Sequence, residues 1–251
     1  MSQKSVPAWA GLVSRLSGYF TEDFLGGPKH LKQAWVIDFH KVVTLFLIYA
    51  LMHHFDNFST EAWVYLGLHG VYGYCWMVKD LAFRDGSFNI RVTYGGALMT
   101  YLLLIGWYWL LPYLFIAEHL QPSGELLFAA IVLHTLGITW MIAADCQKHF
   151  SLKYHKGLIT EGVFSYTRNP NFLGEIMIYG AYAILVNHWI GYAVLAWGCF
   201  FFLVRMLVKD ASISRYPEWD NYQAQSSLLI PWKLLFAPTS GNSTFRKEKT
   251  L

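Results

Sequence analysis

Apolar residues dominate six long segments of the chain, and clusters of polar residues separate them. The segments cover residues 34–55, 62–82, 93–116, 125–144, 171–186 and 190–208. A run of about 20 apolar residues is enough for a helix to cross the hydrocarbon core of a bilayer. The pattern therefore predicts an all-α fold, a polytopic membrane helical bundle with six transmembrane helices. Only three residues join the last two segments, which predicts a tight helical hairpin.

The distribution of charge predicts the orientation of this bundle. All 19 Lys and Arg residues lie on one side of the six spans, or within a turn or two of it, and that side holds both termini. By the positive-inside rule, both termini then face the cytoplasm or the equivalent side of an organelle. The membrane itself stays open: the endoplasmic reticulum in a eukaryote, the inner membrane in a bacterium, or a mitochondrial membrane.

Composition narrows the classes of partner. The chain is 55% hydrophobic and 14% charged, whereas a soluble domain carries about 25% charged residues. The basic residues form no stripe interleaved with aromatic residues, which argues against nucleic acid. The cysteines Cys75, Cys146 and Cys199 lack CxxC spacing, so we expect no metal site and no disulfide framework. The expected partners are the membrane and a lipid substrate.

The two ends of the chain differ from the middle. In residues 1–33, Trp9, Leu12 and Leu16 recur at helical spacing, which is typical of an amphipathic helix lying in the membrane interface. The absence of acidic residues before Glu22 leaves a mitochondrial presequence as the alternative. Residues 237–251 are rich in Ser, Thr and Lys, and this composition predicts a disordered tail.

One motif carries most of the chemical information. The stretch of residues 162–175 leads from a polar turn into an apolar segment, and Pro170 suits the first turn of a helix. Asn171 and Glu175 are four residues apart and share one helix face. An ionisable group within a membrane helix costs about 2.5–3.5 kcal/mol on insertion scales, so it usually faces a partner or a ligand. The motif either caps the helix or binds a polar ligand, and we favour the ligand.

Other polar residues converge on the same end of the predicted bundle. Asp145 and Lys148 follow the fourth segment, while Arg205 and Lys209 form an i,i+4 pair near the end of the sixth. Arg and Lys bind phosphate, and carboxylates accept hydrogen bonds from hydroxyls, so this set suits a ligand with phosphates and ribose hydroxyls. Ordinary snorkelling of Lys and Arg to the interface explains the cations but not the carboxylates.

Residues 135–235 resemble the carboxyl-terminal domain of the steroid 5-alpha-reductase superfamily. The resemblance rests on Asp145, on residues 162–166, on Asn171-Phe172-Leu173-Gly174-Glu175, on Arg205, and on Tyr216-Pro217, Tyr222 and Leu229-Ile230-Pro231-Trp232. It implies that residues 135–236 form a domain that holds NADPH from the cytoplasmic side, with residues 34–134 on the substrate side. The implied cofactor contacts are Asp145, Asn171, Glu175, Arg205, Tyr166, Arg168 and Lys209.

The same domain is similar to isoprenylcysteine carboxyl methyltransferases and phospholipid methyltransferases, which bind S-adenosylmethionine. Their signature resembles Arg-His-Pro-x-Tyr-x-Gly followed by Glu-Glu. Here residues 168–174 lack the histidine, and Lys209-Asp210 stands in the region of the Glu-Glu pair. These departures favour the reductase over the methyltransferase.

The first half of the chain lacks the Gln-Glu pair of the steroid reductases, so the substrate site is less defined. His69 and Tyr72 share one face of the second segment, and either could supply a proton as the catalytic acid. We therefore expect an enzyme, an NADPH-dependent reductase of a steroid-like or isoprenoid-like carbon–carbon double bond. The alternatives are a lipid or isoprenylcysteine methyltransferase that uses S-adenosylmethionine, and a non-catalytic structural subunit of the same fold.

Overall fold

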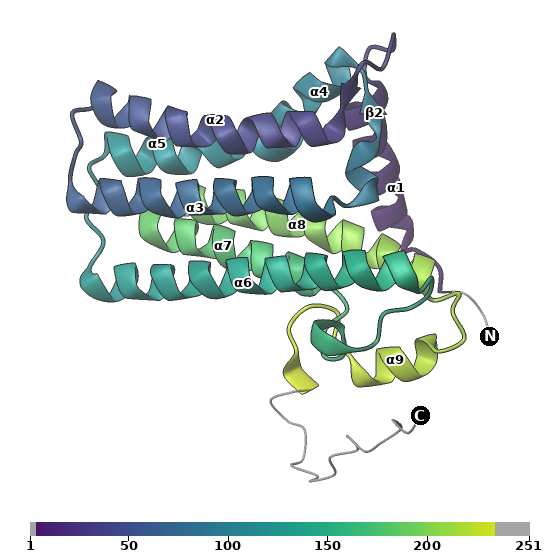
Figure 1. Cartoon of the computed structure of the whole chain (residues 1–251). Helices are drawn as coiled ribbons and strands as arrows, with labels where there is room; N and C mark the ends of the chain where they lie inside the picture. Colours follow the sequence, from purple (N-terminus) through teal and green to yellow (C-terminus); the bar gives the residue numbers. More distant parts are fainter. Residues whose placement is uncertain (1–3, 234–251) are drawn as a thin grey trace.

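Six helical segments lie lengthwise beside one another and form the body of the molecule (Figure 1). The computed structural model describes residues 4–233, so the tail predicted over residues 237–251 lies outside the described residues. All six predicted segments are confirmed as helical. They are α2 (Gln33–His54), α3 (Thr60–Phe83), an interrupted segment over Tyr94–Ala117, α6 (Gly124–Tyr154), α7 (Pro170–Val186) and α8 (Trp189–Ile213).

Four of these segments are long and apolar enough to cross a membrane: Gln33–His54, Tyr94–Ala117, Gly124–Tyr154 and Trp189–Ile213. The apolar helix α7 is shorter, with 17 residues. The fold is therefore that of an all-helical membrane protein, while the count of six spans stays a prediction. The fourth segment also continues ten residues beyond its predicted end at residue 144, because no glycine or proline interrupts it before Gly157.

Local sequence signals set the ends of the helices. Ser59, Thr93 and Ser123 each precede a helix and accept a hydrogen bond from a backbone N–H of its first turn, which is the usual role of an N-cap. Pro170 occupies the first turn of α7, as predicted. Asn187 ends α7 in a left-handed conformation, with φ of 42°. The chain therefore reverses within two residues to begin α8, and the predicted hairpin is confirmed.

The third segment is broken in its middle. It starts as α4 (Tyr94–Thr100), widens into the π-helix η3 (Tyr101–Ile105), tightens into the 3-10 helix η4 (Gly106–Trp109) and ends as α5 (Leu110–Ala117). A Cβ on Gly106 would lie 2.6 Å from the Tyr101 carbonyl oxygen, so the break requires glycine at this position. Pro112 supports the break because it cannot donate a backbone N–H to the preceding turn.

Helices α6 and α7 approach each other closely through two glycines. A Cβ on Gly137 would lie 2.7 Å from the Gly174 carbonyl oxygen, and a Cβ on Gly174 would lie 2.6 Å from the Gly137 carbonyl oxygen. Small residues allow such backbone approach between membrane helices.

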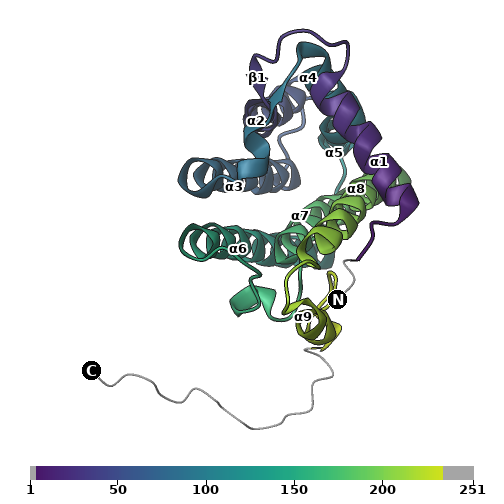
Figure 2. The same cartoon turned by 90° about the vertical axis from the view of Figure 1, so that its right-hand side faces the viewer.

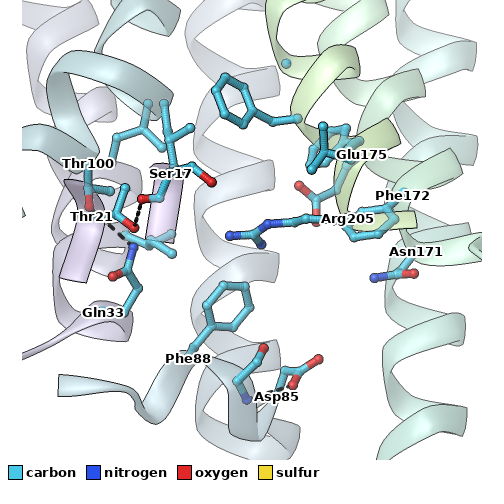
Figure 3. Close-up of a pocket in the computed structure, with 18 of the residues that line it drawn as sticks. Ser17, Thr21, Gln33, Asp85, Phe88, Thr100, Asn171, Phe172, Glu175 and Arg205 are labelled. Atoms are coloured by element: carbon cyan, nitrogen blue, oxygen red, sulfur yellow. Dashed lines mark hydrogen bonds between the residues drawn. The ribbon is translucent and has the colours of Figure 1, made fainter. Parts of the chain in front are cut away.

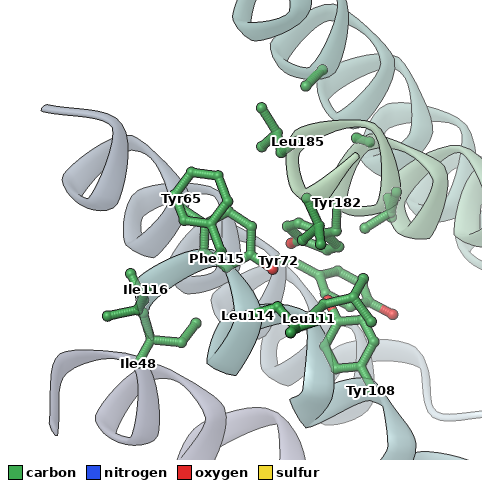
Figure 4. Packing of buried hydrophobic residues seen from close by; sticks show 14 of the residues in the cluster. Ile48, Tyr65, Tyr72, Tyr108, Leu111, Leu114, Phe115, Ile116, Tyr182 and Leu185 are labelled. Carbon is green, nitrogen blue, oxygen red and sulfur yellow. The ribbon is translucent and has the colours of Figure 1, made fainter. Parts of the chain in front are cut away.

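Near the middle of the bundle, aromatic residues fill the core. The rings of Tyr65 and Phe115 stack there with their centroids 4.1 Å apart, beside Tyr182 (Figure 4).

The remaining elements gather at one end of the bundle, together with both ends of the described chain (Figure 1). Helix α1 (Ala8–Gly18) and the π-helix η1 (Tyr19–Asp23) bridge from α8 to α4 (Figure 2). The outer side of α1 exposes Trp9, Leu12 and Leu16, which agrees with the amphipathic pattern. This end also holds a short antiparallel ladder that the sequence did not predict, formed by β1 (Leu31–Lys32) and β2 (Arg91–Val92). The other short elements here are η2 (Gly86–Asn89), η5 (Gly162–Phe164) and α9 (Trp219–Gln225).

Candidate functional site

A cavity of about 550 Å³ lies inside the bundle and extends toward the end that holds the termini. Figure 3 shows side chains from several helices around this space. Its polar lining residues include Ser17, Thr21, Gln33, Lys41, Lys79, Asp85, Thr100, Asp145, Lys148, Asn171, Glu175, Tyr179, Arg205 and Lys209. The lining thus brings together five of the seven residues that sequence analysis assigned to a cofactor: Asp145, Asn171, Glu175, Arg205 and Lys209.

Helix α7 presents a line of polar groups to the cavity. Asn171, Glu175 and Tyr179 follow one another at four-residue spacing, so they lie on one helix face over about 12 Å. Glu175 is buried, and its carboxylate receives one long hydrogen bond of 3.5 Å from the Tyr179 hydroxyl. Among residues 4–233, the Asn171 amide has no hydrogen-bond partner and Glu175 forms no ion pair. The face is therefore open to a ligand.

Arg205 extends from α8 into the cavity on the same side as Glu175 (Figure 3). The side chain is exposed, and it lines the cavity. In the described part of the chain, its guanidinium has no hydrogen bond and no carboxylate within ion-pair distance. Glu175, Asp85 and Glu22 act on it only through longer-range electrostatics. An arginine of this kind can accept a bidentate anionic ligand without first breaking an internal pair.

Two ion pairs form part of the wall. Lys79 Nζ and Asp145 Oδ2 are 2.6 Å apart, and both side chains are almost fully buried. Lys148 pairs with Asp85 at the end of the cavity nearest the termini. Burial of the Asp85 carboxyl opposes its ionisation, but the Lys148 ammonium and Ser87 outweigh that effect and lower the pKa of Asp85 to about 2. Asp145 is thus engaged with Lys79, whereas Glu175 and Arg205 have no ion-pair partner in the part of the chain that the structure describes.

A compact cluster of hydroxyls surrounds a buried lysine deeper in the cavity. Lys41 Nζ donates to the Tyr72 and Tyr179 hydroxyl oxygens, each at 3.1 Å, and the two hydroxyls are 3.0 Å apart. Lys41 and Tyr179 line the cavity, and Tyr72 stands behind them. Sequence analysis counted Lys41 and Lys79 among the cations that lie within a turn or two of one side of the spans, and the structure shows that both are buried inside the bundle. Lys41 lies two turns inside one apolar helix, and Lys79 lies one turn inside another. This depth was the sequence signal for their burial.

The two predicted catalytic residues do not reach the cavity themselves. The Tyr72 hydroxyl lies 3.0 Å from the hydroxyl of Tyr179, a residue that lines the cavity. His69 lies on α3 one turn before Tyr72, and its Nε2 is 3.0 Å from the hydroxyl of Tyr108, a residue that does line the cavity. Each candidate is therefore one hydrogen bond behind a tyrosine in the wall. Sequence analysis did not single out either Tyr108 or Tyr179.

Arg168 and Tyr166 lie outside the cavity lining. The Arg168 guanidinium donates to both Asp210 carboxylate oxygens, with Nε at 3.1 Å from each, and also to the Ser226 carbonyl and hydroxyl. Tyr166 is exposed and pairs through its backbone with Ser227. Lys209 lines the cavity, but its Nζ donates to the Arg168 carbonyl at 2.6 Å and to Asn169. These residues hold the carboxyl-terminal segment against α7 and α8.

The opposite part of the cavity is apolar. Leu104, Ile105 and Leu111 line it from the broken third segment, and α8 contributes Val194, Trp197, Phe201 and Phe202. The break at η3 and η4 directs Leu104, Ile105 and Tyr108 to this lining, in keeping with the frequent occurrence of π-bulges at functional sites. The cavity therefore has a polar, mixed-charge end near the termini and an apolar, aromatic interior.

A comparison with protein families matches residues 90–226 to a family described as a protein of unknown function, DUF1295. The match covers more than half of the 251 residues and contains α6, α7 and α8. The chain belongs to the DUF1295 family. It is also similar to an uncharacterized protein of Schizosaccharomyces pombe, with 23% identity over 117 residues. That similarity spans 46% of this chain and 39% of the yeast protein.

Proposed function

We propose that this member of the DUF1295 family is a membrane-embedded, NADPH-dependent reductase of a carbon–carbon double bond in a lipid. The observation that carries the proposal is one cavity with two chemically distinct parts. Its polar end offers an unpaired arginine, an unpaired carboxylate and an amide, and its interior is apolar with a lysine-backed tyrosine hydroxyl. The association of the family with steroid 5-alpha-reductase-like proteins supports the same function.

The residues at the polar end fit a phosphate-bearing dinucleotide. Arg205 suits a phosphate because its planar guanidinium can donate two parallel hydrogen bonds. Glu175 suits the hydroxyl or amide groups of such a ligand, and Asn171 can both donate and accept. When bound, NADPH supplies a hydride to the double bond. The protein holds the nucleotide, aligns the lipid and excludes water with the aromatic residues Trp197, Phe201 and Phe202.

Two observations favour NADPH over S-adenosylmethionine. S-adenosylmethionine has no phosphate and offers Arg205 only the carboxylate of its methionine part, whereas NADPH offers several phosphate groups to the cations Arg205, Lys148 and Lys209 of the polar end. A methyl transfer also needs no proton donor, whereas reduction of a double bond adds a proton after the hydride, and Tyr179 has the position of a donor. Binding of S-adenosylmethionine in place of NADPH is the outcome that would support the methyltransferase.

Equilibrium binding to the full chain in nanodiscs tests the cofactor. We expect NADPH to bind more tightly than NADH, with the difference shrinking as salt rises, because salt screens the additional phosphate. Glu175→Gln and Arg205→Lys should both weaken NADPH binding, the latter because an ammonium cannot reproduce the bidentate geometry. The matched controls are Glu218→Gln and Arg215→Lys, at exposed positions outside the cavity lining. Equal binding of both nucleotides together with a silent Arg205→Lys would instead favour a non-catalytic subunit.

We also propose that six helices cross the membrane with both termini on the cytoplasmic side. The described ends of the chain lie at the end of the bundle toward which the cavity extends, and the turn between α7 and α8, which contains His188, lies at the other end (Figure 1). Single cysteines at Lys4 and His188, introduced after the three native cysteines are replaced, should react with an impermeant label from opposite sides. Equal labelling of both positions from one side would contradict this topology.

A further inference from the structure

Tyr179 occupies a distinctive place in the wall of the cavity. It lies one helical turn after Glu175, toward the apolar interior, and its hydroxyl closes a triangle with Lys41 Nζ at 3.1 Å and the Tyr72 hydroxyl at 3.0 Å. The third side, from Lys41 Nζ to Tyr72, is also 3.1 Å. Rings further confine the ammonium, which is 4.3 Å from the Tyr72 ring centroid and 5.0 Å from that of Trp76. The cluster is thus fixed from several directions.

Counting donors and acceptors shows where the Tyr179 proton points. A lysine ammonium only donates, so Tyr72 and Tyr179 both accept from Lys41. Among the described residues, the Tyr179 oxygen is the acceptor within reach of the Tyr72 proton, so Tyr72 donates to Tyr179 and both lone pairs of the Tyr179 oxygen are filled. Its proton is then directed away from the triangle, toward the Glu175 carboxylate at 3.5 Å or toward a molecule in the cavity. Since the contact with Glu175 is long, a ligand oxygen or carbon can compete for this proton.

Tyr108 lines the same cavity but uses its proton differently. Its hydroxyl is 3.0 Å from His69 Nε2, and His69 Nδ1 is 3.1 Å from the Tyr65 carbonyl oxygen. A carbonyl only accepts, so Nδ1 carries the proton, and Nε2 of the neutral imidazole must accept from Tyr108. The Tyr108 proton is therefore committed to His69. Of the two tyrosines in the cavity lining, Tyr179 is the one whose proton has only a long contact, to Glu175, and can pass to a ligand.

We propose that Tyr179 is the catalytic acid of the reaction, with Lys41 and Tyr72 as positioning residues. This inference rests on the proposed function. The β carbon of a lipid enone accepts the hydride of NADPH, and the electron pair of the C=C bond moves toward the α carbon. The Tyr179 O–H bond breaks as its proton passes to the α carbon. Alternatively the proton passes to the carbonyl oxygen and gives an enol, which then tautomerises to the saturated ketone. The Lys41 ammonium and the Tyr72 hydroxyl stabilise the tyrosinate, which then regains a proton from water.

The test uses the full chain in nanodiscs with 4-cholesten-3-one as the enone probe. Hydrogen bonding to the carbonyl shifts the enone absorption band to longer wavelength, so binding can be read without turnover. We expect a red shift with the wild type and with Tyr108→Phe, and no shift with Tyr179→Phe, although tryptophan quenching still reports bound steroid. With NADPH present, Tyr179→Phe should reduce the enone at least about 100-fold more slowly, in the range typical of a lost general acid.

Each result separates this inference from the proposed function. A red shift that survives Tyr179→Phe, or is lost in Tyr108→Phe, would overturn the assignment of the acid. NADPH binding without any binding of the enone would also overturn it and leave the cofactor site intact. A red shift without NADPH binding would support the contact with Tyr179 while contradicting the reductase. If Tyr179→Phe does not fold, Lys41→Met provides the test, because loss of the donor to Tyr179 should diminish the shift.

Discussion

Two arginines near the same end of the bundle differ in how completely the fold satisfies them. Arg168 is 6% exposed and forms an ion pair with Asp210 and hydrogen bonds with Ser226, so its guanidinium is committed to holding the carboxyl-terminal segment. Arg205 lines the cavity, and within the described chain it has neither a hydrogen bond nor a close ion pair. A charged group that the fold satisfies contributes to stability, and one left open in a cavity indicates a binding role.

Loss of Arg168 should produce the largest change in stability. Arg168→Met leaves the Asp210 carboxylate buried without its partner, which typically costs about 3–5 kcal/mol of unfolding free energy. Denaturant unfolding in detergent micelles, followed by near-UV circular dichroism, measures the loss. The double variant Arg168→Met with Asp210→Leu should recover much of it, because no unpaired charge remains. A fully stable Arg168→Met protein would contradict the structural assignment.

Lys79 is an intermediate case, since it pairs with Asp145 and also lines the cavity. Lys79→Met should cost about 1–3 kcal/mol, less than the loss of Arg168, because water in the cavity can solvate the freed Asp145 carboxylate. The same variant should weaken nucleotide binding, which Arg168→Met at a temperature where it is folded should not. Denaturant unfolding and NADPH titration of both variants measure this difference. The pair of Arg168 and Asp210 should affect stability alone, and the pair of Lys79 and Asp145 should affect both stability and binding.

Removal of Arg205 should weaken binding without lowering stability. Arg205→Met takes away a charge that has no partner among residues 4–233, so the unfolding free energy should stay equal or rise. The affinity for NADPH should fall about 10- to 100-fold, which corresponds to the loss of a charge-assisted hydrogen bond of about 1.5–3 kcal/mol. Isothermal titration and unfolding on the same preparation test this. A marked loss of stability would erase the contrast with Arg168.

The pair of Asp85 and Lys148 should stabilise the fold in a pH-dependent way, and by less than the pair of Arg168 and Asp210. The folded-state pKa of Asp85 is lowered to about 2, so its stabilising contribution is complete above the ordinary carboxyl pKa of about 4 and is lost as the pH falls through 2. Asp85→Asn should therefore cost about 2 kcal/mol at pH 7. The difference from wild type should shrink below pH 4 and vanish near pH 2. Asp220→Asn, at an exposed position, is the control and should show no such pH dependence.

Much of this arrangement could be predicted from the sequence, because topology alone brings the ends of the helices together. Asn171, Glu175, Asp145 and Arg205 all lie near one end of their helices, and the structure brings them to one cavity. The apolar runs likewise gave the six helical segments. The sequence could not separate Arg205 from Arg168, since the partners of Arg168 come from Asp210 and Ser226, 42 and 58 residues away.

The role of the tyrosines depended on packing between helices that are distant in the chain. Tyr179 had a local signal, because it continues the four-residue spacing of Asn171 and Glu175. Its contacts with Lys41 and Tyr72 span 138 and 107 residues, and no periodicity predicts which faces of α2, α3 and α7 meet. Gly106 and Pro112 lie in the interrupted part of the third segment and were a local signal for the break. The prediction nevertheless treated the segment as one helix, because its apolar run is continuous.

The break at η3 also means that the chain length between Thr100 and Tyr108 decides what the cavity can hold. A π-helix accommodates one more residue than the regular helix, and a helix turns by about 100° for each residue. Deleting a single residue from η3 would let this stretch close into a regular helix, which keeps the direction of the later segment but changes which residues of the stretch face the cavity. Leu104 and Ile105 are the residues of η3 that line the cavity, so the contribution of this stretch to the lining would change. Relatives that differ by one residue in this stretch would accordingly present a different surface to their ligands while keeping the same number of helices.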